Sequence, residues 1–192
     1  MAFTKEWRLK DTVLIGLVAV AFAVVYLAAV YIGVFISTLA TPLGLAPLAN
    51  EPICGIWFMA ATFIAFVLRK PGAAVITNIL AALIEVFLGS FYGPLVFVDG
   101  LVAGLGAELV FALYGYKNFN LAVMCMAGLA SAVTSFTWEL YRSGFIELSW
   151  KFLIIMFPVR CVSGMFFAGF ICSKLGNSLR SAGLLRSFMG NV

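Results

Sequence analysis

The hydrophobic positions of this chain gather into six long apolar runs, separated by short segments that carry most of the charges, glycines and prolines. A helix that spans a membrane needs about 20 predominantly apolar residues. We therefore predict six helices, near residues 12–36, 52–68, 72–90, 95–116, 120–141 and 149–175. The connections between these runs are too short for a separate soluble domain, so residues 1–192 are predicted to form a single helical domain.

The composition supports a membrane solvent for these helices. Hydrophobic residues make up 64% of the chain and charged residues 10%, whereas a soluble domain is roughly 45–50% apolar and about 25% charged. So little polar surface cannot solvate a compact body in water. The prediction is an all-α, integral membrane bundle of six transmembrane helices, placed as a multi-pass protein in the cell membrane.

The basic residues predict the orientation of the bundle. Nine of them fall on the side of the amino terminus: Lys5, Arg8, Lys10, Arg69, Lys70, Lys117, Lys174, Arg180 and Arg186. Only Arg142 and Lys151 fall in the connections on the other side. The positive-inside rule therefore predicts that both termini are cytoplasmic. Because the basic residues are dispersed at helix ends, nucleic-acid binding is not indicated.

Acidic and aromatic residues gather in the predicted external half of the bundle. An ionisable group inside a bilayer costs about 2.5–3.5 kcal/mol, so each one suggests a function. Polar and small residues recur at helical spacing on the third helix (Asn78, Ala82, Glu85, Gly89) and the fifth (Gly128, Ser131, Ser135, Glu139), so both stripes should face inward. Acids with aromatic faces suit an organic cation. The predicted substrate-binding residues are Glu51, Trp57, Asn78, Glu85, Tyr92, Asp99, Ser135, Trp138 and Glu139.

Each of these residues also has a plainer interpretation. Glu51 and Asp99 could be ordinary external helix-end residues. Trp57 and Trp138 could belong to the interfacial aromatic belt. Glu85 could be a structural hydrogen-bond partner.

Two further ionisable residues lie deeper, Glu108 in the fourth helix and Arg160 in the sixth. A mutual or water-bridged ion pair is the favoured interpretation, since each alone would be costly. Pairing of Arg160 with Glu85 is the alternative.

The first helix carries a stripe of small residues, Gly16, Ala19 and Ala23. Small residues let helices approach closely. Spacing alone favours packing inside the bundle over docking of another membrane protein.

Motifs for enzyme chemistry are missing from the sequence. It has no phosphate-binding loop, no Gly-x-Ser-x-Gly motif, no clustered metal ligands and no histidine. The four cysteines stand singly. We predict no enzyme activity, no metal and no cofactor, and any ATPase must be another chain.

Four strings in the sequence resemble a known family. They are Glu51-Pro52-Ile53-Cys54-Gly55-Ile56-Trp57-Phe58, Arg69-Lys70-Pro71-Gly72-Ala73-Ala74, Ala82-Leu83-Ile84-Glu85-Val86-Phe87-Leu88-Gly89 and Gly104-Leu105-Gly106-Ala107-Glu108. With them the chain resembles the YkoE family, substrate-binding S components of energy-coupling factor (ECF) transporters associated with thiamine or its hydroxymethylpyrimidine precursor. The resemblance runs from about residue 8 to residue 180.

This resemblance implies six helices, a vitamin site near the outer surface, and partners: a transmembrane coupling (T) component and cytoplasmic ATPase subunits. It also implies that an Ala-x-x-x-Ala pattern on the first helix contacts the coupling protein. That assigns Gly16, Ala19 and Ala23 to partner docking, against the preference from spacing alone. The separate thiamine-specific S-component family uses a histidine that this chain lacks, so its contacts cannot be transferred.

The leading hypothesis is a membrane-embedded binding subunit of an ATP-driven vitamin importer, with thiamine as transported ligand rather than cofactor. Alternatives are an S component for another small vitamin, a small integral-membrane enzyme acting on lipid, and a structural assembly subunit without a ligand. A cationic ligand predicts that Glu139→Gln costs thiamine far more than a neutral ring.

Overall fold

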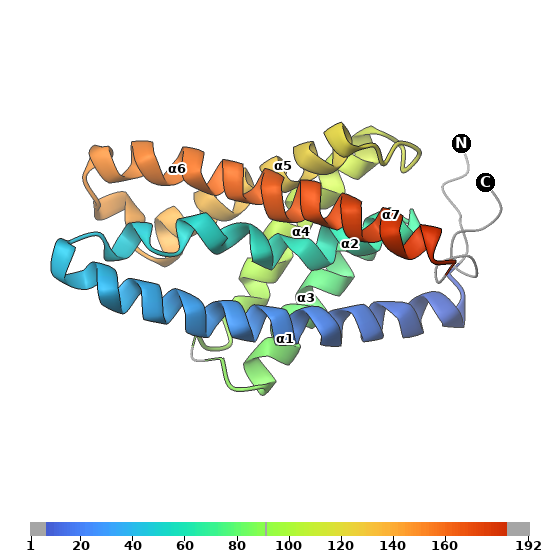
Figure 1. The fold of residues 1–192 in the computed structure, drawn as a ribbon, viewed down its shortest axis with the longest axis horizontal. Coiled ribbons are helices and arrows are strands. Elements are labelled where there is room, and N and C mark those ends of the chain that lie inside the picture. The colour runs from blue at the N-terminus through green and yellow to red at the C-terminus, as the bar shows by residue number, and fades with distance from the viewer. Residues whose placement is uncertain (1–6, 91, 184–192) are drawn as a thin grey trace.

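The computed structural model describes residues 7–90 and 92–183, and within these ranges every regular element is helical. The α-helices are α1 (Leu9–Ala40), α2 (Met59–Leu68), α3 (Ala73–Phe87), α4 (Val96–Leu113), α5 (Leu121–Arg142), α6 (Trp150–Gly164) and α7 (Cys172–Ser181). Short 3-10 segments are η1 (Thr41–Leu43), η2 (Ala46–Leu48), η3 (Glu51–Phe58) and η4 (Phe145–Glu147), and η5 (Met165–Ile171) is a π-helix. Figure 1 shows α1 and the stretch from α6 to α7 running along the long axis, with α3 and α4 crossing it obliquely, and α1 begins at the end of the molecule where α7 finishes.

The six predicted helices are confirmed, with some boundaries moved. Five continuous helical stretches within the described residues are long and apolar enough to cross a membrane, while α3 is a shorter apolar helix. The first helix is longer than the predicted 12–36, because it begins at Leu9 and continues through two polar residues to Ala40. One of them, Thr38, is accommodated because its hydroxyl donates to the Val34 carbonyl at 2.8 Å. The third and fourth are shorter than predicted, since α3 ends at Phe87 and α4 spans only Val96–Leu113, with turns beyond these ends at residues 88–89 and 114–117.

Three of the spanning stretches contain more than one kind of helix, and the first of them passes from α1 into the 3-10 segment η1. The second begins as the 3-10 segment η3, with Pro52 in its first turn, and continues as α2. The sixth passes from α6 through the π-helix η5 into α7. Pro158 lies inside α6 and removes one backbone donor from that helix. Such departures from α-helical geometry are frequent near functional sites.

Glycines let the helices around the external end pack at backbone distance. A Cβ added to Gly55 would lie 2.2 Å from the carbonyl oxygen of Ser163, and one added to Gly128 would lie 2.3 Å from that of Gly164. The Ser163 hydroxyl also accepts from the Gly55 amide at 2.9 Å and donates to the Pro52 carbonyl at 2.8 Å. Together these contacts hold α6 against η3 on one side and against α5 on the other.

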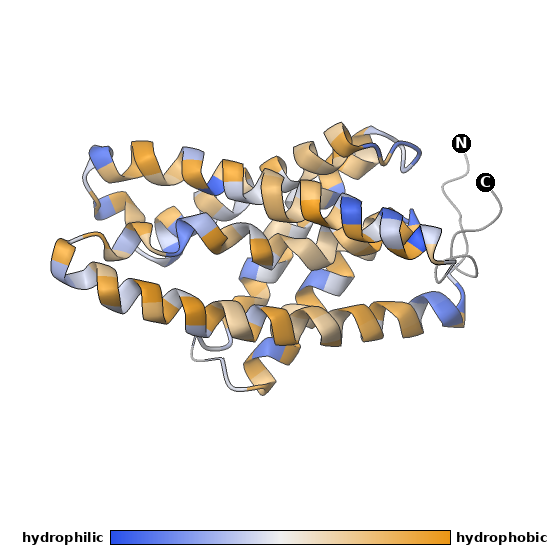
Figure 2. Ribbon diagram, viewed as in Figure 1, coloured by the Kyte–Doolittle hydropathy of each residue, from blue (hydrophilic) through white to orange (hydrophobic). Residues whose placement is uncertain are grey.

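Hydrophobic residues predominate along the lengths of the helices, as the colouring of Figure 2 shows. Large exposed side chains on α1 include Leu17, Val24 and Phe35. The inward stripes predicted for the third and fifth helices are confirmed for the residues inside the helices, since Asn78, Glu85 and Ser131 are at most 1% exposed. Gly89 is the exception, because it lies in the turn after α3 and is exposed. Polar groups inside an apolar body need partners, and these stripes meet at the site described next.

Candidate substrate-binding site

A cavity of about 540 Å³ opens between the helices at the end that holds η1–η4. Side chains from α1, α3, α4, α5, α6 and the 3-10 segments line it. Its charged members are Glu51, Asp99, Glu139, Arg142 and Arg160. A cavity of this size, largely apolar with a few convergent polar groups, is typical of small-molecule sites.

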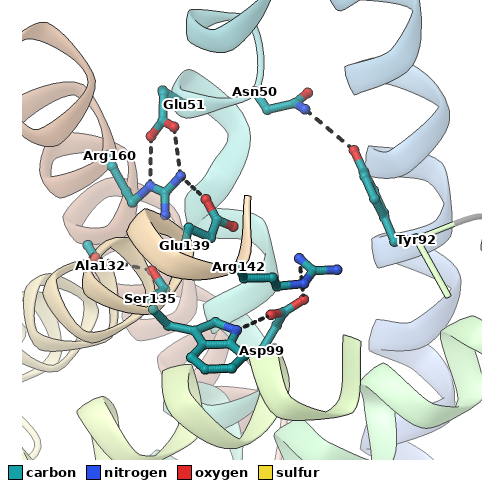
Figure 3. A network of polar contacts seen from close by, with 10 residues as sticks. Asn50, Glu51, Tyr92, Asp99, Ala132, Ser135, Glu139, Arg142 and Arg160 are labelled. Atoms are coloured by element: carbon teal, nitrogen blue, oxygen red, sulfur yellow. Dashed lines mark hydrogen bonds and ion pairs between the residues drawn. The ribbon is translucent and has the colours of Figure 1, made fainter. Parts of the chain in front are cut away.

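Arg160 lies at the centre of the charged group (Figure 3). Its Nε and Nη2 donate to the two carboxylate oxygens of Glu51, both at 2.7 Å, and Nη2 also reaches Glu139 Oε2 at 2.5 Å. The Arg160 and Glu51 side chains are 3% and 1% exposed, whereas Glu139 is 23% exposed. The guanidinium also lies 5.2 Å from the centroid of the Phe136 ring. One arginine thus compensates two carboxylates, and the second, Glu139, borders the cavity.

Asp99 occupies another wall of the cavity. Its Oδ1 accepts from the Trp138 indole at 2.7 Å and its Oδ2 pairs with Arg142 Nη1 at 2.8 Å. Both partners come from α5, so this group ties the amino-terminal turn of α4 to the end of α5. Each Asp99 oxygen already has a strong partner.

The deep end of the cavity is built around Tyr26 of α1. Its hydroxyl donates to Asn78 Oδ1 at 2.9 Å and accepts from the Ala60 amide at 3.1 Å. The Asn78 amide nitrogen in turn donates to the Gly100 carbonyl at 3.0 Å. The Tyr26 ring lies 6.5 Å from the ring of Trp57. This chain of bonds satisfies the buried polar groups and fixes an aromatic floor.

Two loops meet at the outer side of the cavity. Asn50, just before η3, donates to the hydroxyl of Tyr92 at 3.4 Å, and both residues line the cavity (Figure 3). Burial, reinforced by the nearby Glu139 and Glu85, raises the pKa of Tyr92. Tyr92 therefore stays a neutral phenol at the edge of the cavity.

The cavity brings together most of the residues predicted from sequence. The predicted residues that line it are Glu51, Trp57, Asn78, Tyr92, Asp99, Ser135 and Glu139. Trp138 is not among the lining residues but lies behind Asp99, which it holds. Glu85 is fully buried in α3 and accepts a hydrogen bond from Ser90 at 3.0 Å, so the structure places it outside the cavity wall.

The predicted partners of Arg160 were wrong. It pairs with Glu51 and Glu139, not with Glu108 or Glu85. Glu108 instead accepts from the Gly72 amide at 2.6 Å, the Ala74 amide at 3.1 Å and the Tyr116 hydroxyl. Glu108 thus satisfies the first amides of α3, at the far end of the bundle. The sequence indicates how far along its helix a residue lies, and that position alone does not show which carboxylate Arg160 faces.

Several lining residues were not predicted as part of the site. They are Tyr26, Asn50, Cys54, Phe58, Arg142, Phe145 and Arg160 together with neighbouring apolar residues. Tyr26 carries a polar hydroxyl within an otherwise apolar run, which is a usable signal. The sequence carries no signal for the loop residues, because only the packing of the loops brings them to the cavity.

The small-residue stripe of α1 lies mainly inside the bundle. Ala19 and Ala23 are both 0% exposed, whereas a Cβ on Gly16 would meet nothing within 4 Å. Ala19 and Ala23 therefore cannot touch another protein in this conformation. Spacing alone indicated this internal packing, and the assignment to docking implied by the resemblance is not supported for these two residues.

The arrangement suits binding rather than bond-breaking chemistry. Three carboxylates and two guanidiniums line the cavity, which leaves one formal negative charge uncompensated. Trp57, Phe58 and Tyr92 add aromatic surface. Within the described residues, no group of three or more His, Cys, Asp or Glu side chains is placed to hold a metal ion. The cavity therefore favours a small aromatic or cationic molecule.

Known proteins match this chain in sequence and in fold. Residues 10–134 match the family described as "ABC-type cobalt transport system, permease component". The "Putative HMP/thiamine permease protein YkoE" of Bacillus subtilis (strain 168) is 41% identical over 181 residues, covering 94% of this chain and 88% of the relative. A solved structure, "Crystal structure of an S-component of ECF transporter", has a TM-score of 0.90 and 38% identity, covering 96% of this chain and 91% of the other.

These relatives are transporters rather than enzymes, and both the sequence and the fold agree over nearly the whole chain. The chain therefore belongs to the YkoE family and is an S component of an energy-coupling factor transporter.

Proposed function

We propose that this protein captures thiamine, or its hydroxymethylpyrimidine precursor, in the cavity and delivers it to an ATP-driven import complex. A T component and ATPase subunits, as separate chains, would supply the coupling and the energy. The observation that carries the proposal is the uncompensated carboxylate charge in an aromatic-walled cavity. The name of the Bacillus subtilis relative supports the ligand class.

Glu139 is the carboxylate best placed to meet a ligand. Glu51 is 1% exposed and held at both oxygens by Arg160, and both Asp99 oxygens have partners. Glu139 shares Arg160 with Glu51 and is partly exposed on the cavity. The negative charge that Arg160 leaves uncompensated therefore lies mainly at Glu139. The thiazolium ring of thiamine carries a permanent positive charge, which that carboxylate attracts.

The test is a titration of the detergent-purified protein, shown to be folded and ligand-free, with thiamine and with hydroxymethylpyrimidine in parallel, followed by tryptophan fluorescence. Saturable quenching, with the ligand recovered unchanged, is the expected result. Trp150→Phe is the matched control, because Trp150 is 79% exposed and does not line the cavity. No response to either compound would overturn the proposed ligands and favour another small vitamin.

Glu139→Gln separates charge recognition from shape recognition. Loss of an interaction with a charged group costs about 1.5–3 kcal/mol, so thiamine affinity should fall roughly 10- to 100-fold. The neutral hydroxymethylpyrimidine should lose much less. Isothermal titration calorimetry of both ligands on both proteins measures the difference, and equal losses would argue against pairing with the cation.

A further inference from the structure

A second charged site lies at the opposite end of the bundle, where α2 ends and α7 finishes. Arg69 directly follows α2 and adopts the left-handed conformation, with φ 51° and ψ 41°. Few residues other than glycine adopt this region, and doing so costs about 1–2 kcal/mol. Such strain persists only where the surrounding structure holds the residue in place, and it is concentrated at functional positions.

The packing around Arg69 holds its side chain against an aromatic floor. Its guanidinium carbon lies 5.1 Å from the centroid of the Phe119 ring. Phe119 in turn stacks on Phe111 at 5.0 Å and meets Phe66 edge-on at 6.4 Å. The guanidinium is thus partly withdrawn from water, and its Nε is buried without a hydrogen-bond partner. An unsatisfied buried donor of this kind calls for a ligand or water.

A second arginine is brought to the same place by close packing of α7 on α2. A Cβ added to Gly176 would lie 2.5 Å from the ring of Phe66, so only glycine permits this approach. Arg180 lies one turn farther along α7, in its last turn, and is exposed. Burial first, and then the positive charge of Arg180, lower the pKa of Arg69. Because Gly176 packs against Phe66, three residues before Arg69, and Arg180 lies one turn past Gly176, the two positive charges lie near each other at this end of the bundle.

No described carboxylate compensates this pair. At this end of the molecule Asp11 pairs with Lys70 at 2.5 Å, and Glu108 is engaged by Gly72, Ala74 and Tyr116. The ion pairs found within residues 7–90 and 92–183 include neither Arg69 nor Arg180. Like charges side by side with an unmet donor are stabilised by a bound anion, and arginine forks match phosphate oxygens in geometry.

We propose that Arg69 and Arg180 form a binding site for the phosphate group of an anionic phospholipid. Lipid is favoured over free phosphate because exposed apolar side chains precede Arg180 on the same continuous helical stretch, Phe166 and Phe170 in η5 and Leu175 in α7. The predicted orientation puts this end at the inner leaflet, where anionic headgroups attract basic residues. This site is separate from the vitamin cavity and does not depend on the vitamin that is bound.

The experiment measures lipid binding to the delipidated full-length protein in neutral detergent by native mass spectrometry, with its unfolding temperature as second readout. Short-chain phosphatidylglycerol is titrated against phosphatidylcholine of the same chain length and against inorganic phosphate. Phosphatidylglycerol should bind more tightly and raise the unfolding temperature. Equal effects of the two lipids, or an equal rise with inorganic phosphate alone, would overturn the lipid site.

Single substitutions then locate the site. Arg69→Gln and Arg180→Gln should each weaken phosphatidylglycerol binding about tenfold or more, the change expected for loss of a hydrogen bond to a charged group. The double variant should lose little beyond either single one. Lys117→Gln removes the same charge from an exposed position at this end and should bind as the parent does. If Lys117→Gln weakened phosphatidylglycerol binding as much as the arginine variants do, net charge would explain the effect, and the proposal would be overturned.

Arg69→Gly distinguishes a loss of lipid binding from a folding defect. Glycine adopts the left-handed conformation without penalty, so this variant should unfold at no lower temperature than the parent when lipid is absent. Its stabilisation by phosphatidylglycerol should disappear. Retention of the full stabilisation in this variant would contradict the role of Arg69. Far-UV circular dichroism of all variants, together with their unfolding temperatures without lipid, measures whether the fold is intact.

Discussion

At the scale of single residues, Arg160 organises the binding site. It neutralises the fully buried Glu51 through a bidentate contact and leaves Glu139 partly exposed on the cavity. A carboxylate so far from water is stable only while its counter-charge stays in place. Arg160 is therefore a positioning residue for the acidic wall as well as part of that wall.

Arg160→Met should destabilise the protein strongly. Breaking a buried ion pair by removing one partner costs about 3–5 kcal/mol, because the remaining charge is left uncompensated. A large fall in unfolding temperature in detergent is expected. Glu139→Gln is the control, since it leaves the pair of Arg160 with Glu51 intact and should change stability far less. Similar losses in the two variants would contradict this account.

The two tryptophans near the site should differ in their response to ligand. Trp57 lines the cavity, whereas Trp138 acts through its hydrogen bond to Asp99. Trp57→Phe should therefore remove most of the fluorescence quenching by ligand. Trp138→Phe should keep most of the quenching and weaken affinity less than Glu139→Gln does, because the indole bonds to Asp99 and not to the ligand. The reverse order would mean that the ligand lies on the α5 side of Asp99.

At the scale of elements, glycine contacts decide how the helices meet. The backbones of α5 and α6 approach each other at Gly128 and Gly164 because neither residue has a Cβ. This contact sets the distance between Glu139, farther along α5, and Arg160, one turn earlier on α6. The stripe of small residues on α5 was visible in the sequence, but its partner on α6 was not.

Gly128→Ala should therefore disturb both folding and binding. The added methyl group would lie 2.3 Å from the Gly164 carbonyl oxygen, and relieving such overpacking typically costs about 1–3 kcal/mol. Gly16→Ala makes the same change on α1, where nothing lies within 4 Å, and should leave the unfolding temperature unchanged or higher. Thermal unfolding followed by thiamine titration compares the two variants. Equal unfolding temperatures and equal affinities would show that the close contact between α5 and α6 is not needed for folding or binding.

At the scale of the whole molecule, the two ends of the bundle carry different chemistry. One end holds the cavity and its acids, and the other holds the start of α1, the end of α7 and most basic residues (Figure 1). This asymmetry predicts how the protein sits in the membrane, because basic segments stay on the cytoplasmic side. In this predicted orientation the cavity faces the exterior, as the proposed uptake requires.

Cysteine labelling of intact cells checks this orientation. In a background with the four natural cysteines replaced by alanine, Glu147→Cys should react with a membrane-impermeant maleimide. Lys117→Cys should react only after the cells are opened, since it lies at the basic end. Both positions are exposed on the protein, so a difference in labelling reports the side of the membrane and not burial of the residue. The opposite labelling pattern would place the cavity on the cytoplasmic side.

Much of the fold followed from hydrophobicity along the chain. In lipid every backbone polar group must be bonded within the chain, so long apolar runs become helices whatever their neighbours are. The six helices and the inward stripes on α3 and α5 were therefore predictable. The acids Glu51, Asp99 and Glu139 were also identifiable, because charges are costly within a bilayer wherever they lie.

The tertiary structure alone decided which of these groups meet. Arg160 pairs with Glu51 and Glu139, residues 109 and 21 positions away along the chain. Glu85 and Trp138 lie behind the cavity wall rather than in it. Pairing depends on helix rotation and on the distances that contacts such as Gly55 with Ser163 impose. Hydropathy along one chain carries no information on helix rotation or on these contacts. It indicates which residues prefer an apolar environment and not which neighbour each of them faces.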